Sequence, residues 1–106
     1  MAVSFFAKLF SARGRTQAIY ERGLGKAKAK QLDEALVDYN AVIDTKDVAS
    51  DLKAMALLNR GVVFAAKGDF DRAQKDLEAL LKLPNVPANV VDAAKEKLGR
   101  VKRRIP

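Results

Sequence analysis

Few side chains in this sequence could carry out catalysis or hold a metal ion. The 106 residues include no His and no Cys, which excludes the usual near-neutral general base, a thiolate nucleophile and a zinc–thiolate site. Asp69 and Asp71 beside Gly68 come nearest to a metal motif, but a calcium loop needs a longer series of oxygen ligands, and Asp69 is better explained as a helix cap. We therefore predict a non-enzymatic protein with no metal and no cofactor.

Basic residues are abundant and lie mainly at the two ends of the chain. Twenty Lys and Arg against 13 Asp and Glu give a net charge of +7. Residues 1–30 carry +6, residues 31–94 carry −4 and residues 95–106 carry +5. Such basicity would suggest a nucleic-acid or anionic-membrane partner, but its location weakens that inference, because basic ends are often simply solvated. The expected partner is a protein or peptide with an acidic group. Nucleic acid is the less favoured partner, because the closing Lys102-Arg103-Arg104 cluster has no interleaved aromatic side chain to stack on bases.

The N-terminal segment combines three cations with large apolar side chains and no acid. In a helix, Phe5, Phe6, Leu9 and Phe10 would share one face. Docking of that face against the chain's own groove or first unit is the favoured role, because an exposed Phe cluster is costly. Insertion into an anionic membrane surface and a targeting presequence are the alternatives. A secretory signal is not expected, since Lys8 interrupts the apolar run.

An internal repeat organises the chain. Gly23, Gly61 and Gly99 are equally spaced, and their interval is the period of the repeat. Around the first two glycines the identities extend to Ala18/Ala56, Arg22/Arg60, Ala27/Ala65, Asp33/Asp71, Ala35/Ala73, Asp38/Asp76 and Ala41/Ala79. The match around Gly99 is partial, which indicates a truncated third unit.

Each repeat predicts two helices, and no strand pattern is present. In the second helix of each unit, apolar side chains recur at the i, i+3, i+4, i+7 spacing of an amphipathic helix. The first helices are expected roughly from Thr16 to Lys30 and from Leu52 to Lys67.

The turns between these helices have different chemistry in the two units. In unit two, Gly68 can end a helix in the left-handed conformation and Asp69 can cap the next one. The matching Lys30-Gln31 turn has no glycine and should be less well defined. Pro84 and Pro87 should stop the second helix of unit two and shape the start of the last helix.

The spacing of these residues resembles that of the tetratricopeptide repeat family. In unit two, the family's small, aromatic, large and proline positions are matched by Gly61, Phe64, Ala73, Leu77 and Pro84. In unit one, the small and large positions are matched by Gly23, Ala35 and Tyr39. The resemblance covers residues 16 to 99. The sequence departs from the family in its period, which is 38 rather than the usual 34, and at Lys26 and Asp47, where an aromatic residue and a Pro are expected.

The resemblance implies an all-α fold, a tetratricopeptide-like α-α superhelix of two helix-turn-helix units with a C-terminal capping helix and a short N-terminal amphipathic helix. Residues 1–15 would form the N-terminal segment. Unit one would span 16–49, unit two 50–87 and the capping helix 88–104, within a repeat domain of residues 16–106. A helix pair cannot bury its own apolar face, so the units are expected to stack and share a core.

By the same resemblance, the first helices would line a concave groove for a peptide or a helix. The groove residues, carried over by position, are Gln17, Tyr20, Leu24 and Lys28 from unit one, Met55, Leu58, Asn59 and Val62 from unit two, and Lys97 and Arg100 from the last helix. Some family members clamp a C-terminal carboxylate. Asn59 and Lys97 match two positions of that clamp, but Tyr20 and Leu24 stand where Lys and Asn belong, so a true clamp is not expected.

These patterns together predict a cytoplasmic protein–protein interaction module, an adaptor or assembly factor, with an apolar groove and a basic edge. One alternative is a peripheral membrane protein that uses the Phe-rich N-terminal segment and the basic ends. A nucleic-acid accessory protein is another, and steeply salt-dependent binding would be its signature. Self-association, with the N-terminal helix of one chain in the groove of the next, is a further alternative.

Overall fold

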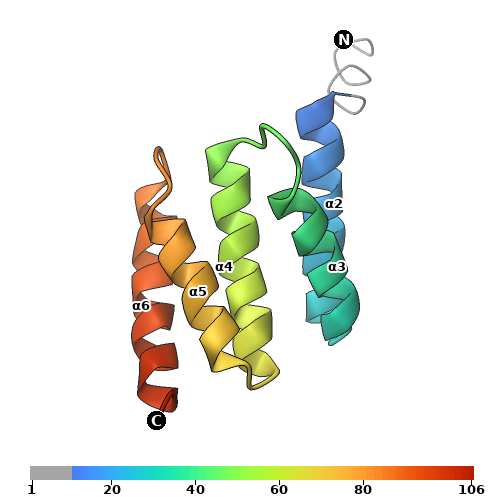
Figure 1. The fold of residues 1–106 in the computed structure, drawn as a ribbon. Helices are drawn as coiled ribbons and strands as arrows, with labels where there is room; N and C mark the ends of the chain where they lie inside the picture. Colours follow the sequence, from blue (N-terminus) through green and yellow to red (C-terminus); the bar gives the residue numbers. More distant parts are fainter. Residues whose placement is uncertain (1–10) are drawn as a thin grey trace.

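The computed structural model describes residues 11–106, which form five α-helices and no strand (Figure 1). The helices are α2 (Ala12–Lys28), α3 (Leu32–Ile43), α4 (Ser50–Ala66), α5 (Phe70–Leu81) and α6 (Ala88–Arg104). The expected all-α fold is confirmed over these residues. The N-terminal segment with Phe5, Phe6, Leu9 and Phe10 lies outside the described part of the chain.

Helices that follow each other in the chain are neighbours in space. α2 packs against α3, α4 against α5, and α6 against α5 and α4, so the molecule is a row of two helix pairs closed by a single helix (Figure 1). α3 also packs against α4 and joins the two pairs.

The sequence repeat sets the bounds of every helix. α2, α4 and α6 begin at residues 12, 50 and 88 and end at residues 28, 66 and 104. These intervals equal the spacing of the three repeated glycines, and α3 and α5 are offset by the same interval at both ends. The partial sequence match around Gly99 therefore accompanies a full match in helix length and position.

The first helix begins four residues before the expected position at Thr16. It starts at Ala12, where the side-chain oxygen of Ser11 accepts a hydrogen bond from the backbone N–H of Gly14 at 2.9 Å. This cap satisfies one of the free donors at the helix start. The residues just before Thr16, assigned above to the N-terminal segment, thus belong to α2.

The other helix ends agree more closely with the sequence pattern. α4 starts at Ser50, two residues before the expected Leu52. α5 ends before Pro84, and α6 follows Pro87 directly, as predicted. Within residues 11–106, no helix has the length and apolar character needed to cross a bilayer.

Two apolar clusters form the core, and α4 contributes to both. The first consists of Tyr20, Ala35, Tyr39, Val42, Leu52, Ala56 and Val63. The second consists of Ala54, Leu57, Ala73, Leu77, Leu80, Ala94 and Val101. α4 is therefore the central helix, with one side against each cluster.

The repeated charged residues form ion pairs with buried carboxylates at the same place in each unit. The guanidinium of Arg22 donates two hydrogen bonds to Asp38, at 3.1 and 2.8 Å, and that of Arg60 donates two to Asp76, at 2.8 and 2.6 Å. The exposed fractions of Asp38 and Asp76 are 1% and 5%. Each pair links the first helix of a unit to the second through two parallel hydrogen bonds, the strongest geometry for such a pair.

The first two repeated glycines, Gly23 and Gly61, lie where the two helices of a unit touch. A Cβ added at Gly23 would lie 2.8 Å from the ring of Tyr39, and one at Gly61 would lie 3.3 Å from the side chain of Leu77. A side chain at Gly23 would therefore displace the Tyr39 ring, whereas one at Gly61 would require Leu77 to shift by only a few tenths of an ångström.

Left-handed residues recur with the same period. Lys30 (φ 64°) in the turn of unit one corresponds to Gly68 (φ 83°) in unit two, and Asp47 (φ 59°) in the first link corresponds to Asn85 (φ 57°) in the second. Gly, Asn and Asp tolerate this conformation, whereas Lys does so at a cost of roughly 1 kcal/mol.

The two turns also differ in capping. Asp69 accepts a hydrogen bond from the backbone N–H of Arg72 at 3.2 Å, as predicted, while Gln31 makes no side-chain cap. The unit-one turn therefore has the geometry of the unit-two turn without its favourable residues.

Candidate functional site

Two cavities lie along α4, one toward each end of the helix. The α2/α4 cavity, of about 270 Å³, is lined by Arg13, Gln17, Tyr20, Glu21, Leu24, Asp51, Leu52 and Met55. The α4/α6 cavity, of about 150 Å³, is lined by Gly61, Val62, Ala65, Leu77, Lys97, Arg100 and Val101. All but Leu77, which comes from α5, lie on the first helices, α2, α4 and α6.

The structure divides the sequence-predicted groove residues between these cavities. Gln17, Tyr20, Leu24 and Met55 come together in the α2/α4 cavity, and Val62, Lys97 and Arg100 come together in the α4/α6 cavity. Leu58 and Asn59 lie on α4 between the two. Lys28 is exposed in the last turn of α2 and lines neither cavity.

The polar groups of the α2/α4 cavity are paired with each other. Arg13 donates two hydrogen bonds to Asp51, at 3.3 and 3.0 Å, and the hydrogen bond from Arg13 lowers the pKa of that carboxyl. Gln17 donates to Glu21 at 3.4 Å. Both residues of the Arg13–Asp51 pair are well exposed, so the pair adds little stability. Glu21, whose partner Gln17 is neutral, leaves the cavity lining with one net negative charge.

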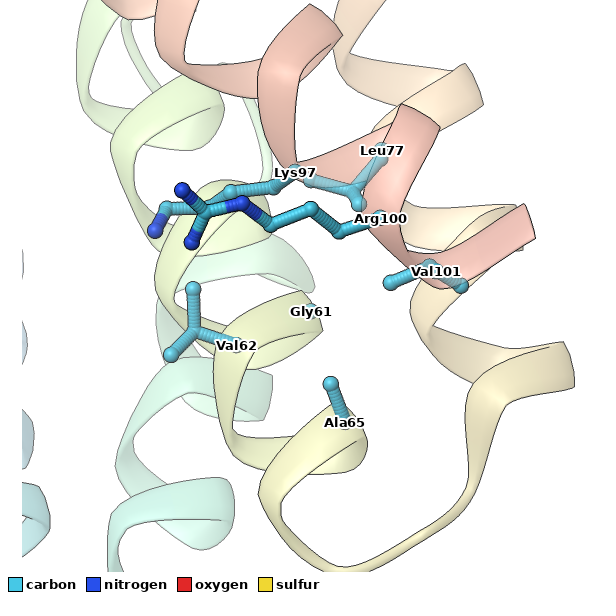
Figure 2. Close-up of a pocket in the computed structure, with 7 residues that line it drawn as sticks. All are labelled: Gly61, Val62, Ala65, Leu77, Lys97, Arg100 and Val101. Atoms are coloured by element: carbon cyan, nitrogen blue, oxygen red, sulfur yellow. The ribbon is translucent and has the colours of Figure 1, made fainter. Parts of the chain in front are cut away.

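The α4/α6 cavity has the opposite character, with an apolar floor and an unbalanced positive edge. Val62 and Ala65 lie on its α4 side, and Lys97 and Arg100 reach across from α6 so that their nitrogen atoms lie near Val62 (Figure 2). Lys97 makes no ion pair with any residue from 11 to 106, and Arg100 pairs only with the exposed Glu96 of its own helix at 2.7 Å. No acid lines this cavity. It is therefore suited to a ligand that joins an apolar group to a negative charge.

Asn59 performs a structural task that the sequence did not indicate. Its side-chain amide donates hydrogen bonds to the hydroxyl of Tyr20 on α2 and to the backbone carbonyl of Met55, both at 2.9 Å. These two bonds use both amide hydrogens, so none is left for a ligand carboxylate. The contact connects α2 with α4.

Several lining residues were missed at the sequence level. Leu77 and Val101 belong to the second core cluster, and only their edges line the α4/α6 cavity. Val101 follows the buried Ala94 by seven residues, two helical turns, and this periodicity could have identified it. Asp51 could not have been found in this way, because its role depends on the early start of α2.

Residues 11–106 contain no grouping of three or more acidic side chains that could hold a metal ion. Searches with protein-family models, with curated proteins and with solved structures found no match to this chain.

Proposed function

We propose that this chain is a tetratricopeptide-like interaction module whose α4/α6 cavity binds an acidic, aliphatic segment of a protein partner. The cavity itself carries the proposal, because apolar atoms form its floor, no acid lines it, and Lys97 on its edge has no ion-pair partner among residues 11–106. An aliphatic side chain would enter beside Val62 and Ala65, and a neighbouring carboxylate would meet Lys97.

The arrangement of helices supports the same function. The recurring helix bounds, the glycine contacts and the Arg–Asp pairs build a rigid frame that presents the first helices along one line. A site built on rigid helices binds with little ordering cost. The α2/α4 cavity, whose lining has one net negative charge, would accept an uncharged part of a longer segment.

A binding measurement with a defined peptide tests this proposal. The probe is a fluorescein-labelled peptide in which valine and leucine alternate with glutamates, titrated with the protein and followed by fluorescence anisotropy. Lys97→Glu should weaken binding about tenfold or more, because it places like charges in contact. Val62→Asp should weaken it similarly by placing a carboxylate on the apolar floor.

Lys95→Glu is the matched control. Lys95 is exposed on the same helix and lines neither cavity. It therefore reports the effect of net charge alone. Equal binding by Lys97→Glu and Lys95→Glu would refute the proposed site.

A further inference from the structure

α3 and α6 carry net charges of opposite sign. Residues 31–51, which contain α3 and the following link, hold six acids and one base, a net charge of −5. Residues 88–106, which contain α6, hold six bases and two acids, a net charge of +4. α3 and α6 do not touch, and Figure 1 shows them toward opposite ends of the row. α3 and α6 therefore present opposite net charge, although α2, which packs beside α3, carries five bases and one acid.

The two exposed large hydrophobic side chains of residues 11–106 lie on surfaces of opposite charge. Val37 on α3 is 65% exposed, and Val62 in the α4/α6 cavity is 39% exposed. Val37 shares its side of α3 with Glu34 and Asp33, which are three and four residues earlier. Val62 lies below the two cations of α6. Val37 therefore has negative charge beside it and Val62 has positive charge beside it, so the two surfaces would attract each other.

The charges next to these valines are available for an external partner. Asp33 pairs with Lys67, but Glu34 makes no ion pair within the described residues. Lys97 likewise has none among residues 11–106. An unpaired acid beside one exposed valine and an unpaired base beside the other form a complementary set.

We propose that the occupant of the α4/α6 cavity is α3 of a second copy of this chain, with Val37 on the apolar floor and Glu34 facing Lys97. This inference rests on the proposed function and names its partner. Because the two surfaces differ and lie apart on the molecule, the contact is head-to-tail. Each chain that gives its α3 face keeps its own cavity free for another copy, so the assembly grows with concentration.

Sedimentation velocity over a range of protein concentrations tests the inference. The full chain should show an average mass that rises with concentration at low salt and falls as NaCl is added, because salt screens the contact. Glu34→Lys and Lys97→Glu should each reduce association about tenfold or more. Glu78→Lys on α5 and Lys95→Glu on α6 are the charge-matched controls and should leave association unchanged. Circular dichroism establishes that every variant is folded.

Mixing two variants that each lack one surface gives the sharpest result. Val37→Asp damages the α3 face and keeps an intact cavity, whereas Val62→Asp damages the cavity and keeps an intact α3 face. The two damaged surfaces cannot join each other, because both carry a new carboxylate. An equimolar mixture should therefore form a one-to-one complex that does not grow further, although each variant alone is monomeric. Failure of the mixture to associate would overturn the inference.

Two other outcomes also count against this contact. If the full chain stays monomeric up to its solubility limit, α3 is not the occupant. If association survives both charge reversals but is lost when residues 1–10 are removed, the N-terminal segment makes the contact instead. The acidic peptide, titrated into the monomeric Glu34→Lys variant, tests the proposed function separately. If the peptide binds but the chain does not self-associate, the proposed function is supported and the proposed α3 contact is refuted.

Discussion

The buried carboxylate of Asp38 makes the stability of the fold depend on pH. It is 1% exposed, accepts two hydrogen bonds from Arg22 and lies 3.1 Å from the ammonium of Lys26. The hydrogen bond from Arg22 is the main cause that lowers the pKa of Asp38, and burial opposes it. Because the folded state favours the ionised form, this pair stabilises the fold above the ordinary carboxyl pKa near 4, and that contribution is lost as the pH falls further.

Asp38→Asn should therefore lower the free energy of unfolding at pH 7 by about 1–3 kcal/mol, because Arg22 and Lys26 lose their charged partner. The variant should also lose less stability than the original chain between pH 5 and pH 3. Thermal melts across this pH range measure both effects. Glu78→Gln, which alters a carboxyl with no ion pair in residues 11–106, is the control. Parallel pH profiles for Asp38→Asn and the original chain would contradict the assignment.

The hydroxyl of Tyr39 is buried and has no hydrogen-bond partner within the described residues. Burial is the main cause that raises its pKa from 10 to about 12. Tyr39→Phe should therefore leave stability unchanged or raise it by up to about 1 kcal/mol. Tyr20→Phe should instead destabilise by about 1 kcal/mol, because Asn59 loses its acceptor.

The pH dependence of Tyr39→Phe supplies a second measurement. The folded state favours the neutral phenol, so its contribution is present below pH 10 and is lost as the pH rises toward 12. Chemical denaturation at pH 8 and pH 11 should show a smaller loss of stability for Tyr39→Phe than for the original chain. An equal loss in the two proteins would show that Tyr39 does not titrate in the expected range.

At the scale of the element, the two within-unit turns share a shape but differ in residues. Copying Gly68-Asp69 into unit one as the double substitution Lys30→Gly and Gln31→Asp should relieve the left-handed lysine and add a helix cap. We expect a gain of about 1–2 kcal/mol in the free energy of unfolding. The reverse change, Gly68→Lys with Asp69→Gln, should lose a similar amount. Urea denaturation measures both changes in the free energy of unfolding. Changes of the same sign would contradict the prediction.

Periodicity predicted the helices well because burial on one side repeats along the chain. The inward positions Ala35, Tyr39 and Val42 are fully buried, and the proline boundaries hold. The start of α2 was missed because no apolar period precedes Thr16. A serine cap and a contact from Arg13 to the distant Asp51 decide where that helix begins, and neither has a periodic signal.

The candidate site was predicted only in part, for a related reason. Position in a repeat indicates which side of a helix a residue occupies, and Val62, Lys97 and Arg100, chosen by position, line one cavity in the structure. It does not indicate which side chains are already engaged. The hydrogen bond between Asn59 and Tyr20, and the pairing of Arg22 with Asp38, depend on distances across helices that only the packed structure supplies. The sequence did contain a sign of the Arg22–Asp38 pair, because both residues recur in the next unit as Arg60 and Asp76.

At the scale of the whole molecule, stability should decrease from the centre of the row toward its ends. α4 packs against both core clusters, whereas α2 and α6 are each covered from one side. In linear arrays of repeats, terminal helices open without unfolding the centre. Hydrogen–deuterium exchange should therefore show the slowest exchange in α4 and the fastest in the first turns of α2 and the last turns of α6. Uniform protection across all five helices would indicate a single cooperative unit.

The matching links before α4 and before α6 have a consequence for how such a chain can change in length. Asp47 and Asn85 give the two links the same left-handed step, and each link introduces a helix of the same length at the same place in its unit. A second copy of residues 50–87 inserted after Pro87 would therefore be entered through the link that now leads into α6 and left through a copy of that link. That segment is in this sense a building block, which tandem duplication could add or remove while the first pair and the closing helix stay as they are.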